Sequence, residues 1–299
     1  MKIAFFMTVC EGEYDIAQDA LESLIQSCRG IDISLFVVDD ASPSRVGWRL
    51  ANRFRELTSQ PSDCFELPKS LGFRGMIQRK FLGLERIANS KTFFDIVLKL
   101  DPDALVTRYD LGEFLTKQCS DGLGFYGELY GMRKRDALLY CADLLPFGFR
   151  RRQVDGVIQH QWELSRVSPV WWTDIGWKAI ANGFHFTFIP GCFWFMGGKT
   201  LKSLHEAGYL ARNQSSYGFV FNDDLILTTS VYAIKHPVKD LNLISPHWRK
   251  AMAMSEGTPL SIIEQLMPYV IHPLKNNPDA WERRQQLKVL REHWFSNTH

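Results

Sequence analysis

The sequence predicts an α/β fold in which helices pack against a central sheet that begins as a parallel one. Two observations predict it. Short apolar runs alternate with stretches of helical periodicity from the start of the chain, which is the pattern of successive βαβ units. The chain of 299 residues, 45% of them hydrophobic and 23% charged, is also long enough to bury a full core. We therefore expect either one large domain or two intimately packed ones.

The start of the chain is expected to form one βαβ unit. Residues 2–9 are an apolar run typical of a buried strand. In residues 14–29 the apolar side chains fall on one helical stripe, and residues 33–38 form a second apolar run. Because a strand, a helix and a strand in this order give a parallel pair, the sheet is expected to begin as a parallel one.

The second strand ends in two acids, Asp39 and Asp40, ahead of a helix expected over about 44–59. In one interpretation, Asp40 accepts hydrogen bonds from a nucleobase or a ribose. In the other, both acids cap the following helix, because side-chain oxygens accept hydrogen bonds from the free amides at a helix start. The sequence leaves both interpretations open.

A short third strand is expected at 64–67, and the loop 68–75 leads from it into a helix. The loop has two glycines, and basic residues gather around the helix start, where backbone amides and the helix dipole favour an anion. These residues are Lys69, Arg74, Arg79 and Lys80. Neither a G-x-G-x-x-G after the first strand nor a G-x-x-x-x-G-K-[ST] is present, which disfavours a dinucleotide site and a P-loop.

A fourth strand, over 96–100, ends in Asp101 and Asp103 with Pro102 between them. Carboxylates at the carboxyl end of a strand face the crevice where open α/β sheets bind ligands. Because Pro102 forces a turn, the two acids could reach one hard cation, such as a divalent metal that holds a diphosphate. The alternative is a turn with two solvated acids.

Residues 121–190 carry less specific signals. A strand-like start at 122–126 is followed by basic clusters at 133–135 and 150–152, which are either solvated faces or surfaces that attract an anionic acceptor or lipid headgroup. Tryptophans in this region pack in a core more often than they form a platform for a sugar ring. They are Trp162, Trp171, Trp172 and Trp177.

Strand character returns at 186–198, and a helix is expected over about 199–207. Asp223 and Asp224 then begin a helix that reaches about residue 234, and helix capping accounts for one of these acids but does not require both. An amphipathic helix over 279–295 closes the fold.

The composition excludes several classes of function. A net charge of +2 with scattered basic residues gives no reason to expect a nucleic-acid partner. The six cysteines include no C-x-x-C pair, which argues against a zinc knuckle and fits reduced thiols. The sequence predicts no signal peptide, and no apolar run approaches the roughly 18–20 residues of a membrane-spanning helix. We therefore expect a cytoplasmic protein, at most peripheral to the inner face of a membrane.

The order of these motifs resembles the nucleotide-sugar half of a GT-A glycosyltransferase and is most similar to the large family-two group. The resemblance rests on Val-Asp-Asp-Ala-Ser at 38–42, the basic loop 68–75 and Leu-Asp-Pro-Asp at 100–103, and it covers about residues 1–120. It implies a single domain over residues 1–299, folded as a three-layer α/β/α sandwich in which helices cover both faces of a central, mostly parallel mixed sheet. It also implies a UDP- or GDP-sugar donor, Mn²⁺ or Mg²⁺, and transfer to a hydroxyl of an unknown glycan, lipid-linked or protein acceptor.

The resemblance also implies an acceptor-side half over about 121–275 and a C-terminal helix over about 276–299. By the same resemblance, the metal ligands are Asp101, Asp103 and His272, with His247 as the weaker alternative for the histidine. The expected nucleotide-sugar contacts are Thr8, Asp39, Asp40, Gly72, Arg74, Arg79, Asp101 and Lys275.

For the sugar and the acceptor, the resemblance places Trp194, Gly197 and Gly198 beneath the reacting groups, although Trp194 could equally belong to the core. The general base is Asp224 or Asp223, with Asp224 preferred because Asp223 then replaces the Glu that precedes the base in the family. A single base opposite the leaving group implies inversion at the anomeric carbon.

Two other functions fit parts of the sequence. A nucleotidyltransferase that makes activated sugars would need a Gly-rich, Arg-bearing loop after the first strand, and residues 8–14 contain only Gly12. A non-catalytic relative that binds a sugar or a nucleotide would be favoured if Asp223 and Asp224 pointed away from the pocket that contains Asp101.

Overall fold

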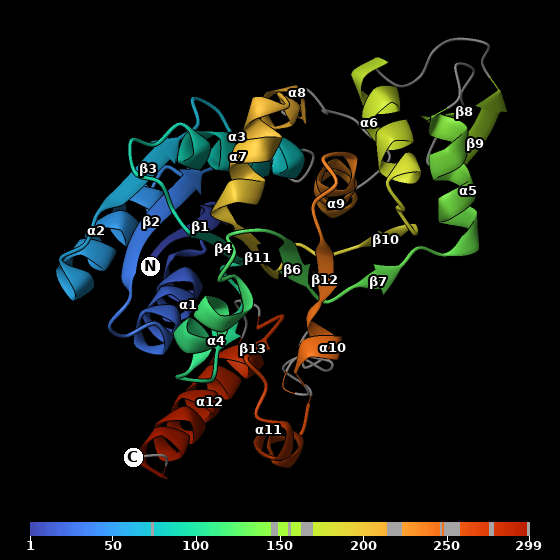
Figure 1. Cartoon of the computed structure of the whole chain (residues 1–299). Coiled ribbons are helices and arrows are strands. Elements are labelled where there is room, and N and C mark those ends of the chain that lie inside the picture. The colour runs from blue at the N-terminus through green and yellow to red at the C-terminus, as the bar shows by residue number, and fades with distance from the viewer. Residues whose placement is uncertain are drawn as a thin grey trace.

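The computed structural model has a seven-stranded sheet at its centre, with helices on both faces (Figure 1). It describes residues 1–72, 75–144, 149–154, 157–162, 170–213, 223–245, 247, 258–274 and 278–297. The strand order is β12-β6-β11-β4-β1-β2-β3. The α/β architecture predicted from the sequence is confirmed.

The first half of the chain forms parallel strands joined by helices. The strands are β1 (Lys2–Val9), β2 (Asp32–Asp39), β3 (Ser62–Glu66) and β4 (Ile96–Leu100), and β1 pairs with both β2 and β4. The helices between them are α1 (Tyr14–Ser27), α2 (Val46–Thr58) and α3 (Met76–Ala88). The carboxyl-terminal ends of these four parallel strands therefore share one edge of the sheet, and this edge carries Asp39, Asp40 and Asp101.

The second half of the sheet contains a strand that runs the other way. β11 (Phe193–Gly197) is antiparallel to β4, with Phe193 opposite Leu100 and Gly197 opposite Ile96. β6 (Phe125–Gly127) pairs antiparallel with β11 and parallel with β12 (Val238–Asp240). Because of this reversal, the beginning of β11, not its end, lies beside the tip of β4.

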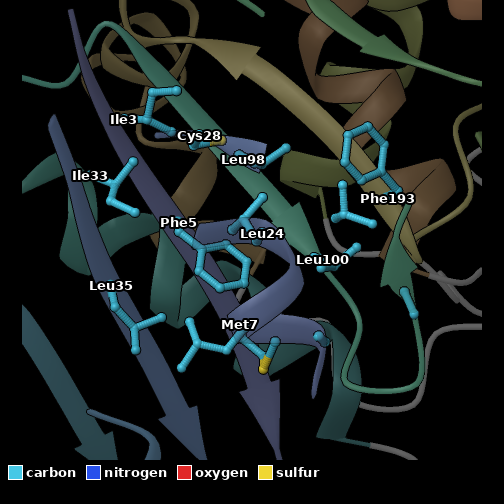
Figure 2. Close-up of a cluster of buried hydrophobic side chains, with 14 of the residues drawn as sticks. Ile3, Phe5, Met7, Leu24, Cys28, Ile33, Leu35, Leu98, Leu100 and Phe193 are labelled. Carbon is cyan, nitrogen blue, oxygen red and sulfur yellow. The ribbon is translucent and has the colours of Figure 1, made fainter. Parts of the chain in front are cut away.

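The core has two layers because successive side chains of a strand point to opposite faces. In β1, Ile3, Phe5 and Met7 join a cluster with α1 and α2, and Figure 2 shows them beside Leu24 of α1 and Leu98 of β4. Ala4 and Phe6 join the other cluster, which contains α3 and α7 (Gly198–Glu206). Both faces of the parallel strands are thus buried, as their near-continuous apolar runs predict.

Smaller elements complete the described fold. β5 (Leu105–Val106) pairs antiparallel with β13 (Val270–Ile271), β7 (Tyr130–Gly131) with β10 (Thr187–Phe188), and β8 (Phe149–Val154) with β9 (Val157–Trp162). The other helices are α4 (Leu111–Gln118), α5 (Lys134–Asp143), α6 (Val170–Ala181), α8 (Tyr209–Asn213), α9 (Asp223–Ala233), α10 (Leu241–Ile244), α11 (Leu260–Leu266) and α12 (Pro278–Asn297).

The expected helices at 44–59, 199–207 and 279–295 occur as α2, α7 and α12, with ends shifted by one or two residues. The two-residue strands β5 and β13 were not expected, because so short a pairing leaves little periodicity in a sequence. The hairpin of β8 and β9 was not expected either. Within the described part of the chain, no helix combines the length and the apolar character needed to span a membrane.

Candidate functional site

Two acids and a histidine meet at the tip of β4. Asp101 and Asp103 follow the strand directly, and His272 follows β13. The Nε2 atom of His272 lies 3.1 Å from Oδ1 of Asp103 and 3.9 Å from Oδ2 of Asp101. The ligand atoms of all three side chains lie within 4.8 Å of one another, and each residue is partly exposed.

His272 arrives there through the pairing of β13 with β5. Ile271 lies opposite Leu105, so the residues that follow β13 run back along those that precede β5. The backbone amide of Leu274 donates to the carbonyl of Asp103 over 2.7 Å, which extends this pairing past His272. His272 lies 169 positions after Asp103 in the sequence. The register between β13 and β5 therefore brings the two residues together.

The donor set of this cluster suits a divalent metal ion. Two carboxylates and an imidazole offer hard oxygen and borderline nitrogen ligands, a combination that Mn²⁺ accepts readily and Mg²⁺ accepts in part. Burial alone would raise the pKa of Asp103, but the hydrogen bond and charge of His272, together with Lys99, hold the pKa below its ordinary value. Asp103 therefore favours the ionised form that a metal requires.

A cavity of about 250 Å³ adjoins the cluster. It opens between the strand ends, α3 and the start of α9, so it collects side chains from distant parts of the chain. Its lining residues are Thr8, Met76, Lys80, Lys99, Asp101, Pro190, Gly191, Cys192, Asp224 and His272. Asp224 thus faces the same cavity as Asp101, as a catalytic role for this acid requires.

Asp224 is paired with a buried lysine. Nζ of Lys80, on α3, lies 2.8 Å from Oδ1 of Asp224, and Lys80 is only 2% exposed. Gly191 makes room for this pair, because a Cβ atom at that position would lie 2.5 Å from Oδ1 of Asp224 and 2.9 Å from Nζ of Lys80. The ammonium group of Lys80 therefore fixes the position of the Asp224 carboxylate in the cavity.

Asp101 also has a buried lysine beside it. Lys99 points from β4 to the face opposite Leu98 and Leu100, and its Nζ donates to Asp101 Oδ1 and to the carbonyl of Gly191. Lys99 is 3% exposed. The ammonium group of Lys99 therefore already binds one carboxylate oxygen of Asp101, a candidate metal ligand.

Asp39 is fully buried and holds the start of α2. Its carboxylate accepts hydrogen bonds from the amide of Ser42 (2.9 Å), the hydroxyl of Ser42 (2.7 Å) and the amide of Gly47 (2.7 Å). Asp39 has no exposed surface through which it could contact a nucleotide. The capping alternative therefore holds for this acid.

Asp40 organises the loop that follows β3. It accepts from the hydroxyl of Ser70 (2.8 Å), the amide of Leu71 (2.8 Å) and the amide of Gly72 (3.2 Å), and it pairs with Arg79 of α3. Asp40 is 4% exposed. Its oxygens hold the basic loop in place, and the predicted contact with a base or ribose stays a prediction.

The positions of Gly197 and Gly198 correct the sequence-based expectation. Because β11 is antiparallel to β4, Gly197 lies opposite Ile96 and Gly198 beside Asp95, roughly 16–20 Å along the strand from Asp101. A Cβ atom at Gly197 would lie 2.1 Å from the carbonyl oxygen of Gly122, and one at Gly198 would lie 1.8 Å from that of Phe94. These glycines allow close backbone packing and do not approach the cavity.

Trp194 belongs to the core and is not a platform for a sugar. It is fully buried, and its ring meets Phe125 edge to face at a centroid distance of 5.4 Å. Trp172 is likewise fully buried. His247 lies apart from the metal cluster, with Nδ1 3.0 Å from the carbonyl of Leu266. Arg74, Lys275 and the side chain of Asp223 lie outside the described residues.

Lys99 and Gly191 were not identified from the sequence. A signal for Lys99 was present, because a lysine within the apolar run Ile-Val-Leu-Lys-Leu needs an anionic partner when the strand is buried. Gly191 had no comparable signal, since its importance comes from Lys80 and Asp224, which are distant in sequence.

No protein-family model matches the chain, and no curated protein matches it in sequence. Its fold is similar to that of the glycosyltransferase GlyE of Streptococcus pneumoniae TIGR4, with a TM-score of 0.42 and 12% identity over 99% of this chain and 63% of that one. The chain is also similar to the mannosyltransferase PcManGT from Pyrobaculum calidifontis, which was solved with GDP-Man and Mn²⁺. The TM-score is 0.42 and the identity 13%, over 97% of this chain and 62% of that one.

The galactosyltransferase LgtC, solved with donor and acceptor sugar analogs, gives a TM-score of 0.48 and 12% identity over 98% of this chain and 96% of that one. The chain thus spans less than two thirds of GlyE and of PcManGT but nearly all of LgtC. All three are glycosyltransferases by name.

Proposed function

We propose that this protein is a metal-dependent glycosyltransferase that moves a sugar from a nucleotide-diphospho-sugar to an acceptor hydroxyl. The observation that carries the proposal is the meeting of Asp101, Asp103 and His272 at the carboxyl edge of the parallel strands, beside a cavity that also contains Asp224. Open α/β sheets bind ligands at this edge. The Asp224 position supports a catalytic protein over a non-catalytic binder.

On the donor side, Asp101, Asp103 and His272 would hold Mn²⁺ or Mg²⁺. When bound, such an ion supplies Lewis-acid stabilisation for the negative charge that develops on a departing diphosphate. Lys99 and Lys80 add two fixed positive charges to the same cavity. Thr8, at the end of β1, lines this cavity, and Asp40 would hold Gly72 and Arg79 where the nucleotide binds.

On the acceptor side, Asp224 is our candidate for the general base. An ionised carboxylate within reach of the acceptor hydroxyl accelerates transfer on the order of a hundredfold or more. Lys80 orients this carboxylate from α3, at 2.8 Å. One base on the side opposite the leaving group leads to direct displacement, so we expect inversion at the anomeric carbon.

The test is a thermal unfolding experiment with UDP or GDP, each with and without Mn²⁺. A ligand that binds only the folded protein raises the unfolding temperature, so we expect stabilisation only when nucleotide and metal are both present. Asp103→Asn should remove this response. Asp15→Asn, which changes an exposed acid on α1, is the matched control and should keep it.

Transfer itself would be followed as release of UDP or GDP from candidate sugar donors. Asp224→Asn should keep the nucleotide-dependent stabilisation but lose turnover by about a hundredfold. If the wild-type protein responded to neither nucleotide in the presence of metal, the proposed function would be wrong.

A further inference from the structure

Arg284, on the C-terminal helix α12, is a fully buried charged residue that the proposed reaction does not use. Taking a guanidinium out of water costs several kcal/mol unless its partners compensate. Its Nε and Nη1 have no hydrogen-bond partner among the described residues. Such a residue needs a reason beyond the packing of α12.

The contacts of Arg284 lead to the candidate metal site. Its Nη2 donates to the carbonyl of Leu274 over 2.8 Å, and the amide of the same Leu274 donates to the carbonyl of Asp103 over 2.7 Å. Leu274 lies two residues after His272. The guanidinium therefore holds Leu274, at the far end of the segment 272–274. This segment places His272 against Asp103.

The other side of Arg284 is anchored to α1. Its Nη1 lies 3.8 Å from Oδ2 of Asp19, whose Oδ1 is 2.6 Å from Nζ of Lys288. Burial lowers the pKa of Arg284, whereas the charges of Asp19 and Asp103 act in the opposite direction. The guanidinium is thus fixed between α1 and the segment that follows β13, and α12 lies along both (Figure 1).

We propose that Arg284 is a positioning residue that holds His272 in the metal site, so that α12 is part of the apparatus for metal binding. The inference rests on the proposed function, because it needs a metal at Asp101, Asp103 and His272. Groups that orient a metal ligand without touching the metal typically change its affinity by 10–100-fold when they are removed.

Packing of α12 does not depend on this charge. Leu287 and Leu290 of α12 pack with Leu105, Ile271 and Leu274 in an apolar cluster of their own. Without the guanidinium, Asp19 keeps its ion pair with Lys288 at 2.6 Å, so no buried charge is left unpaired. Loss of Arg284 should therefore affect the position of His272 more than the stability of the fold.

The experiment compares Mn²⁺ affinity and metal-free stability in full-length variants. Mn²⁺ alone is titrated by calorimetry, and unfolding is followed in EDTA. We expect Arg284→Met to unfold at a temperature close to that of the wild type but to bind Mn²⁺ at least about tenfold more weakly. Arg284→Lys, which keeps one donor for the Leu274 carbonyl, should recover part of the affinity.

Arg283→Met is the matched control. Arg283 precedes Arg284 on α12 and is almost as buried, but its guanidinium bonds Gln286 of the same helix. This variant should bind Mn²⁺ as the wild type does.

Equal Mn²⁺ affinity in wild type and Arg284→Met would overturn this inference and leave the proposed function intact. Failure of Arg284→Met to fold in EDTA would also overturn it, because stability alone would then account for the buried arginine. A wild-type protein that bound no Mn²⁺, with or without UDP or GDP, would overturn the proposed function and this inference together.

Discussion

Two pairs of acids lie at the same edge of the sheet, and the structure gives them opposite surroundings. Asp39 ends β2 and Asp40 follows it, and the two residues are 0% and 4% exposed. Asp101 and Asp103 follow β4, and their side chains are 27% and 25% exposed. Both pairs occur at strand ends in the sequence, so position alone does not separate them.

The difference lies in the donors that reach each carboxylate. Asp39 and Asp40 are held mainly by backbone amides and serine hydroxyls, which are part of the fold and cannot leave without disturbing it. Asp101 and Asp103 are held by the side chains of Lys99 and His272. The first pair shapes the site, and the second remains available to a metal.

The largest effect expected from this comparison is on stability. Asp39→Ala leaves the amides of Ser42 and Gly47 buried without their acceptor, and we expect the free energy of unfolding to fall by about 3 kcal/mol or more. Urea denaturation in EDTA measures it. Asp103→Ala should cost far less, because the oxygens of Asp103 are partly hydrated.

Asp32→Ala is the control for that experiment, since Asp32 is exposed at the other end of β2 and should leave stability nearly unchanged. If Asp39→Ala and Asp103→Ala lost equal amounts of unfolding free energy, the proposed difference between the acids at the end of β2 and those after β4 would be wrong.

A smaller effect concerns the lysine that holds Asp101. Lys99→Met frees Oδ1 of Asp101 and removes a positive charge next to the metal ligands. We expect Mn²⁺ alone, without nucleotide, to bind about tenfold more tightly, a difference of about 1.4 kcal/mol. Titration calorimetry with Mn²⁺ measures this affinity.

Lys80→Met is the matched control, because Lys80 is equally buried in the same cavity but pairs with Asp224. Its Mn²⁺ affinity should change much less. Weaker Mn²⁺ binding by Lys99→Met than by the wild type would mean that Lys99 supports the metal ligands and does not compete for them.

The smallest effect is on acid stability in the absence of metal. The pKa of Asp103 is depressed in the folded protein, so its contribution to stability is present above the unfolded-state pKa and is lost as the pH falls through the folded-state pKa. Below about pH 4, the free energy of unfolding should therefore fall less steeply for Asp103→Asn than for the wild type.

We expect this difference to reach about 1 kcal/mol at most, because a quarter of the Asp103 side chain is exposed. Urea denaturation in EDTA at several pH values between 3 and 5 measures it, with Asp15→Asn as the control. Parallel acid profiles for Asp103→Asn and the wild type would show that His272 does not stabilise the ionised acid.

Part of the candidate site could be predicted because its residues are close in sequence to a strand end. Asp101 and Asp103 share one turn after β4, and Asp40 follows β2, so strand prediction and the direction of the chain bring them to one edge. His272 was predicted by resemblance. Gly197 and Gly198 were misplaced, because an apolar run predicts a strand but not its direction in the sheet.

What the sequence by itself determined was the α/β class, the parallel start of the sheet and the acids at the strand ends, because these depend on periodicity over a few residues. The tertiary structure decided the rest. It set β11 antiparallel, placed His272 beside Asp103 and brought Lys80 to Asp224. Contacts between distant segments depend on strand pairing and on the matching of buried charges, which local pattern does not encode.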